Sequence, residues 1–69
     1  MIGIFKTNVG NPEERQQMIQ AISASFPVGN CHVDLDDCDK VLRIADLQVE
    51  EKTIVDFVKK LGFECQPLE

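Results

Sequence analysis

The order of short apolar stretches along the chain is the feature that most constrains its fold. Short stretches rich in β-branched and aromatic side chains flank two longer stretches in which apolar residues recur every three or four positions. We expect strands over residues 2–7, 31–36, 40–44 and 63–66, and helices over residues 12–25 and 49–61. The predicted order is strand, helix, strand, strand, helix, strand.

Local signals set the ends of both predicted helices. Asn11 is a favourable N-cap, Pro12 suits the first helical position, and Glu14 stands where a capping box has its acidic residue. Pro27 ends the first helix, and Gly62 stands where a glycine commonly ends a helix. The residues expected on the buried faces are Met18, Ile19, Ile22 and Phe26 in the first helix, and Ile54, Phe57, Val58 and Leu61 in the second.

The middle of the chain predicts a hairpin between the two helices. Residues 31–36 alternate almost strictly, with Cys31, Val33 and Leu35 on one face, as in a half-buried strand. Residues 37–39 are the expected tip. Two right-handed crossovers around this hairpin give one α+β domain over residues 1–69 with a ferredoxin-like arrangement. In that fold, a four-stranded antiparallel sheet carries both helices on one face.

Composition excludes several classes of function. The net charge of −5 and the absence of Trp and Tyr argue against nucleic-acid binding, which needs a basic stripe or aromatic platforms. An odd number of cysteines, three, does not make a disulfide framework, and no secretory signal is visible before the first strand. No stretch approaches the ~20 apolar residues of a membrane span. We therefore expect a cytoplasmic protein with reduced thiols. Leu68-Glu69 resembles a cloning remnant and carries no weight in the prediction.

The end of the chain resembles one family. Residues 54–64 place Ile54, Val58, Gly62, Phe63 and Glu64 in the pattern I-x-x-x-I-x-x-x-G-[YF]-E, with valine at the second apolar position. This is similar to the ending of heavy-metal-associated domains, the copper-chaperone family. The second strand and the first helix also resemble that family, which implies the same βαββαβ fold over most of the chain.

The motif that defines this family is missing. In the family, M-x-C-x-x-C in the first strand–helix loop offers two thiolates to Cu(I) or Zn(II) at a helix N-terminus. Here Val9 stands at the methionine, Asn11 at the first cysteine and Glu14 at the second. The resemblance therefore implies a degenerate member, and of the residues near that loop only the aromatic Phe63 matches.

Other metal-ligating residue types are scattered. The acidic run that begins at Asp34 lacks the glycine and glutamate of an EF-hand loop. His32 faces the opposite side of its strand from Cys31, so those two cannot share a metal ion. The remaining candidates for a non-standard Cu(I) or Zn(II) site are Cys38, at the exposed hairpin tip, and Cys65, for which core packing is the alternative.

The first strand offers a possible interface. If Phe5 and Thr7 face the helices, as the resemblance implies, Ile2 and Ile4 project from the open face of the sheet, where Val41 joins them. In the opposite register, Ile2 and Ile4 face the core.

These observations favour a small non-enzymatic binding or interaction module. It has no expected catalytic residue or cofactor, and its open sheet face would contact a second copy or another protein. Two alternatives stay open. One is heavy-metal binding or trafficking through non-standard ligands, and the other is a regulatory domain that senses a small molecule, since amino-acid-sensing domains share the βαββαβ order.

Overall fold

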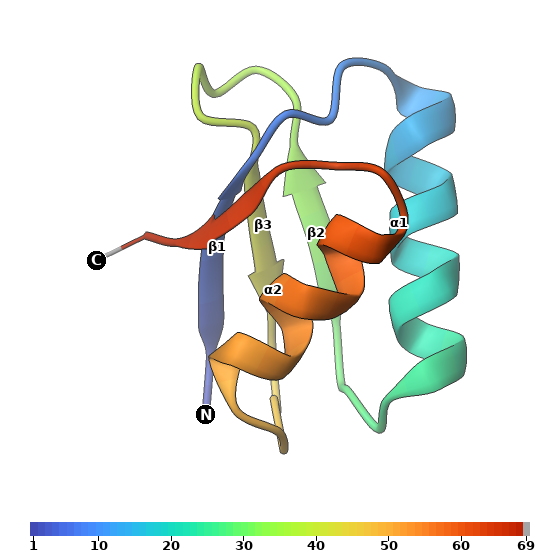
Figure 1. The fold of residues 1–69 in the computed structure, drawn as a ribbon. Coiled ribbons are helices and arrows are strands. Elements are labelled where there is room, and N and C mark those ends of the chain that lie inside the picture. Colours follow the sequence, from blue (N-terminus) through green and yellow to red (C-terminus); the bar gives the residue numbers. More distant parts are fainter. Residues whose placement is uncertain (69) are drawn as a thin grey trace.

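The computed structural model describes residues 1–68 and has the predicted order of elements (Figure 1). The elements are β1 (Gly3–Thr7), α1 (Pro12–Ser25), β2 (Cys31–Asp34), β3 (Val41–Ile44), α2 (Glu51–Lys60) and β4 (Cys65–Pro67). The strands form one antiparallel sheet in the order β2-β3-β1-β4. The predicted α+β, ferredoxin-like fold is confirmed.

Strand β2 ends earlier than the alternation of its residues predicts. The Asp36 N–H donates to the Asp34 carboxylate at 3.0 Å, which turns the chain directly after Asp34. Lys40 closes the hairpin with a left-handed φ of 46°, and its ammonium donates to the Leu35 carbonyl at 2.7 Å. Local side-chain bonds to the backbone thus end the strand where the apolar pattern alone would continue it.

Helix α1 begins and ends at the predicted signals. The Asn11 side chain accepts a hydrogen bond from the Glu14 N–H at 2.8 Å, so Asn11 is the N-cap and Pro12 is the first helical residue. Phe26 is already extended because the residue before a proline disfavours helical backbone angles. Met18 and Ile22 are buried on the inner side of this helix.

Helix α2 ends in a Schellman motif built on Gly62. The Gly62 N–H donates to the Lys59 carbonyl at 3.0 Å, and the Phe63 N–H donates to the Val58 carbonyl at 3.3 Å. Gly62 has a φ of 101°, which side-chain-bearing residues rarely adopt. Leu61 was expected on the buried face but is 40% exposed, and it is the C-cap of the helix, where the regular helical spacing ends.

A single core joins the inner face of the sheet to both helices. Its fully buried side chains come from three strands, both helices and the loop after β1: Phe5, Val9, Met18, Ile22, Val33, Leu42, Ile44, Ile54 and Val58. Phe26 and Phe57 add an edge-to-face contact between the two helices, with ring centroids 5.1 Å apart. The opposite face of the sheet alternates with this one and carries Lys6, His32 and Arg43, which are all exposed.

Both edge strands are poorly suited to pairing with another chain. Strand β2 is only four residues long, so its edge offers few backbone groups for pairing. Strand β4 is three residues long and ends in Pro67, which has no N–H to donate. The part of the sheet best placed for contacts is therefore its open face.

Candidate functional site: the open sheet face and its surroundings

The loop between β1 and α1 holds the positions at which the resembled family carries its metal motif. Val9 is fully buried in the core. The Asn11 side-chain oxygen accepts from the Glu14 N–H, and the Glu14 carboxylate accepts from the Gly10 N–H, both at 2.8 Å. These are hard oxygen atoms already engaged in helix capping, whereas Cu(I) prefers thiolates. The residues present do not fit a soft metal ion.

The start of β4 lies against the same loop. The Glu64 N–H donates to the Asn8 side-chain oxygen at 2.8 Å, across 56 positions of sequence. This bond places the half-buried Phe63 beside the loop, as the resemblance implies for the aromatic residue. The loop thus has the start of β4 beside it but no cysteine of its own.

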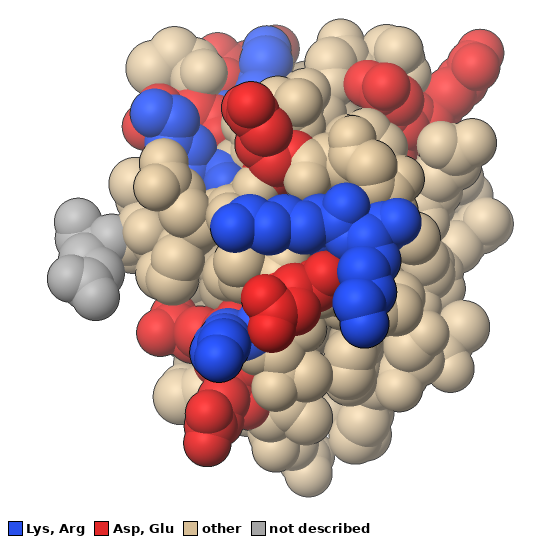
Figure 2. Space-filling view, in the orientation of Figure 1, with Lys and Arg blue, Asp and Glu red and all other residues tan. Residues whose placement is uncertain are grey.

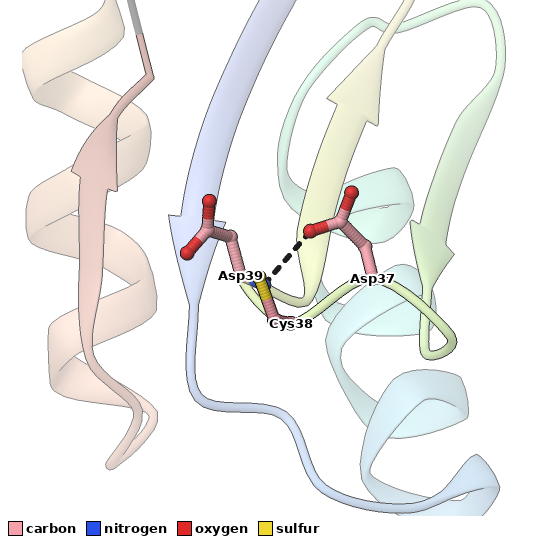
Figure 3. Close-up of side chains that lie close together, drawn as sticks. All are labelled: Asp37, Cys38 and Asp39. Atoms are coloured by element: carbon pink, nitrogen blue, oxygen red, sulfur yellow. Dashed lines mark hydrogen bonds between the residues drawn. The ribbon is translucent and has the colours of Figure 1, made fainter.

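The tip of the β2–β3 hairpin brings together one thiol and two carboxylates (Figure 3). One ligand atom from each of Asp37, Cys38 and Asp39 lies within 4.8 Å of the others. However, the Asp37 carboxylate accepts from the Asp39 N–H at 2.8 Å, and the Asp39 carboxylate lies 3.5 Å from the Lys6 ammonium. Both carboxylates therefore have partners within the protein, and an exposed acidic cluster alone does not define a metal site.

The two cysteines proposed as metal ligands do not converge. Thr7 pairs with Cys65 on the β4 side of β1, while the Thr7 N–H donates to the Asp39 carbonyl on the β3 side. Cys38 is exposed and Cys65 is buried, so the hairpin tip and the thiol of β4 lie on opposite sides of one strand. Each cysteine would need other ligands to hold a metal ion.

The two inner thiols are held in their protonated form. Burial raises the pKa of the Cys31 thiol from 9.0 to about 11. Burial also raises the pKa of the Cys65 thiol to about 11, although the nearby Lys59 ammonium opposes the shift. Because the thiolate is the form that binds metal ions and attacks electrophiles, Cys31 and Cys65 are poorly prepared for either role at neutral pH.

The predicted orientation of β1 is confirmed. Phe5 and Thr7 are buried toward the helices, Ile2 is 66% exposed and Ile4 is half-buried. Leu68 adds to them, because its N–H donates to the Ile4 carbonyl at 2.9 Å and its side chain is 37% exposed. We name Ile2, Ile4 and Leu68 the apolar corner. From the sequence alone, Leu68 resembles part of a cloning remnant and is not predicted to belong to this patch. Glu69 lies outside the described residues.

The expectation that Val41 shares this exposed patch is wrong. Val41 lies outside the core cluster but is only 4% exposed. It pairs with Asp34 of β2, and the β1–β3 register places Lys6 on its other side. The short side chain of Val41 lies in a central strand and is enclosed by the longer side chains of its neighbours. Ile2 precedes Gly3, the first residue of β1 that pairs with β3, and is therefore less enclosed.

Charged and polar groups border the apolar corner on the open face. Arg43 pairs directly with Ile4, and His32 pairs with Arg43, so these exposed side chains form one row across the sheet. Lys6 lies two residues beyond Ile4 and contacts Asp39. An apolar centre with a polar rim is the usual anatomy of a contact surface for another protein.

Two cavities were not found by the sequence reasoning, because each is lined by residues far apart in the chain. One, of about 350 Å³, lies at the end of the molecule where β1 begins and is lined by Met1, Pro27, Val28, Gly29, Asp46, Leu47 and Gln48. The other, of about 670 Å³, lies at the far end of β1 and is lined by Lys6, Thr7, Lys59, Gly62, Phe63, Glu64, Cys65 and Gln66.

Comparison of the chain with family models, curated proteins and solved structures gave no match. Among residues 1–68, no helix is long and apolar enough to cross a membrane. The fold and surface described above are thus the basis for assigning a function.

Proposed function

We propose that this protein is a small, non-enzymatic binding module that contacts a protein partner through the open face of its sheet. The observation that carries the proposal is the apolar corner. Ile2, at 66% exposure, lies beside Ile4 and Leu68 on a sheet face from which the helices are absent. Large aliphatic side chains grouped on an exposed surface commonly mark contact sites.

The rim of the corner supports recognition of a protein. Arg43 and Lys6 stand beside Ile4 and offer exposed cations whose aliphatic stems extend the apolar surface. Since both edge strands are short and β4 ends in proline, a partner would dock on the face and would not add a strand.

The arrangement of titratable groups supports a role without catalysis. His32 is the only histidine of the chain and is exposed on the open face. Of the thiols with raised pKa, Cys65 is buried and Cys31 is half-buried against the core, and Cys38, the exposed thiol, lies at the hairpin tip between two aspartates. Enzyme sites usually place such groups in a concave pocket next to a partner base or acid.

The proposal is tested by selecting peptides from a displayed random library against the wild-type protein. We expect enriched peptides to shift the amide resonances of β1 and β4, and to lose most of their affinity for Ile4→Asp. Leu61→Asp is the control, because Leu61 is an aliphatic residue with an exposed side chain that lies at the end of α2, away from the open face. Thermal unfolding of each variant checks that the fold is retained.

Two outcomes would contradict the proposal. One is a selection that enriches no peptide. The other is a set of peptides that binds Ile4→Asp as tightly as the wild type, or that shifts resonances of the helices alone.

A further inference from the structure

One row of side chains crosses the open face of the sheet from β2 to the end of β4. The strand registers place His32 beside Arg43 and Arg43 beside Ile4, and the Leu68 N–H joins Leu68 to Ile4. We name these four residues the cross-strand row. Neighbouring strands lie about 4.8 Å apart, so the row spans roughly 14 Å. Nitrogen-bearing side chains occupy the half over β2 and β3, and aliphatic side chains occupy the other half.

Arg43, in the middle of this row, forms no ion pair among residues 1–68. The one ion pair in that part of the chain joins Lys6 to Asp39. Asp34 lies diagonal to Arg43 in the β2–β3 register, but its carboxylate accepts from the Asp36 N–H at 3.0 Å. Arg43 is exposed, so its planar guanidinium can form two parallel hydrogen bonds to a carboxylate from another molecule.

The positive half of the row contrasts with the rest of the chain. Acidic residues outnumber Lys and Arg by 12 to 7, yet the cross-strand row contains no carboxylate. On the side of the molecule where α2 lies, Lys and Arg side chains stand next to Asp and Glu (Figure 2). Near the open face the carboxylates gather toward the hairpin, at Asp34, Asp36 and Asp37. A carboxylate from a partner is therefore attracted to Arg43 and repelled nearer the hairpin.

We propose that the cross-strand row binds a short segment of a partner protein in which an acidic residue stands two positions from an apolar one. The inference rests on the proposed function, since it names the chemistry of the partner that the open face contacts. The carboxylate of the segment pairs with Arg43, and its apolar side chain packs on the half-buried Ile4 and on Leu68, which is 37% exposed.

The spacing of two positions follows from the geometry of the strands. In an extended segment, side chains on one face are two residues apart, which is about 7 Å. The middle of the Ile4–Leu68 pair lies one and a half strand spacings from Arg43, which is also about 7 Å. An extended segment that crosses the strands can thus present its carboxylate and its apolar side chain to the two halves of the row at once.

The sequences of peptides selected from the displayed random library test this inference. We expect Asp or Glu two positions from an aliphatic or aromatic residue to be enriched. Replacing that acidic residue with its amide should weaken binding to the wild-type protein about tenfold, because a charge-assisted pair of hydrogen bonds is lost. The same replacement should change binding to Arg43→Gln little, because that variant already lacks the charged partner.

Three protein variants separate the position of the charge from the net charge. Arg43→Glu should lose most of the affinity for the selected peptides, and Arg43→Lys should retain part of it, since lysine keeps the charge without the planar fork. Arg15→Glu is the matched control, because it makes the same change of charge on α1, which packs on the inner face of the sheet. It should bind the peptides like the wild type, and thermal unfolding checks the fold of each variant.

Selected peptides without an acidic residue overturn the inference, as do peptides that bind Arg43→Glu as tightly as the wild type or lose equal affinity for Arg15→Glu. If such peptides still lose their affinity for Ile4→Asp, the binding module stands and only the chemistry assigned to its partner is wrong. A selection that enriches no peptide contradicts the proposed function, and this inference with it.

Discussion

Replacing Gly62 with alanine isolates the cost of the turn between α2 and β4. Gly62 has a φ of 101°, and an added Cβ would meet no atom within 4 Å, so the penalty comes from the backbone alone. A left-handed conformation costs a side-chain-bearing residue roughly 1–2 kcal/mol. Alanine also stabilises by about 0.4–1 kcal/mol through a less flexible unfolded chain. We therefore expect a net loss of about 1 kcal/mol, out of roughly 3–5 kcal/mol for a domain of this size.

Urea unfolding followed by circular dichroism measures this loss, and thermal unfolding should show a midpoint about 4–8 °C lower. Gly62→Asn should recover part of it, because asparagine tolerates left-handed angles. Gly10→Ala is the control: Gly10 has no left-handed φ, and its nearest contact to an added Cβ is a flexible glutamate oxygen at 3.4 Å. Equal stability of Gly62→Ala and wild type, or an equal loss in Gly10→Ala, would refute the assignment of the cost to the Schellman turn.

Two further predictions concern the thiols. The Cys31 and Cys65 thiols have a pKa of 9.0 when unfolded and of about 11 in the folded protein, so their protonated forms stabilise the fold below pH 9 and this stabilisation is lost as the pH rises to about 11. Urea unfolding across this range should show that the free energy of unfolding falls more steeply for the wild type than for the double variant Cys31→Ala, Cys65→Ala. Equal slopes for the two proteins would contradict the prediction. In anaerobic titrations we expect Cu(I) and Zn(II) to bind the wild type no more tightly than they bind the double variant Cys38→Ser, Cys65→Ser. The reason is that the Cys65 thiol is buried and protonated, and that the carboxylates beside Cys38 already have partners within the protein. Clearly tighter binding by the wild type would support a role in metal trafficking.

The elements of the fold were predictable because their signals are local. Asn11 and Glu14 form their capping bonds within four residues of each other, and Gly62 lies where the helical pattern stops. The alternation of Cys31 and Val33 defines which face of β2 is buried. Each of these signals involves neighbours in sequence, so no knowledge of the tertiary arrangement is needed to read it.

The surface was harder to predict because exposure depends on neighbours from other strands. Val41 and Ile2 both have side chains on the open face, yet one is 4% exposed and the other 66%. The difference follows from the strands on either side of Val41, which alternation within a single strand cannot reveal. Leu68 was missed for the same reason, because its pairing with Ile4 joins positions 64 residues apart.

The residues of the β1–α1 loop cap helix α1 and do not fit a soft metal ion. A helix N-terminus has a limited set of backbone N–H groups, and a capping box and a pair of metal-bound thiolates use the same ones. In this chain the Asn11 side chain accepts from one of these groups, the Glu14 N–H, the Glu14 carboxylate accepts from the Gly10 N–H just before the cap, and Val9 is packed in the core. Replacing the two capping residues with cysteines would remove the cap at the same time as it supplied the thiolates. The loop thus holds α1 in place, and exposed side chains available for recognition are found on the open sheet face.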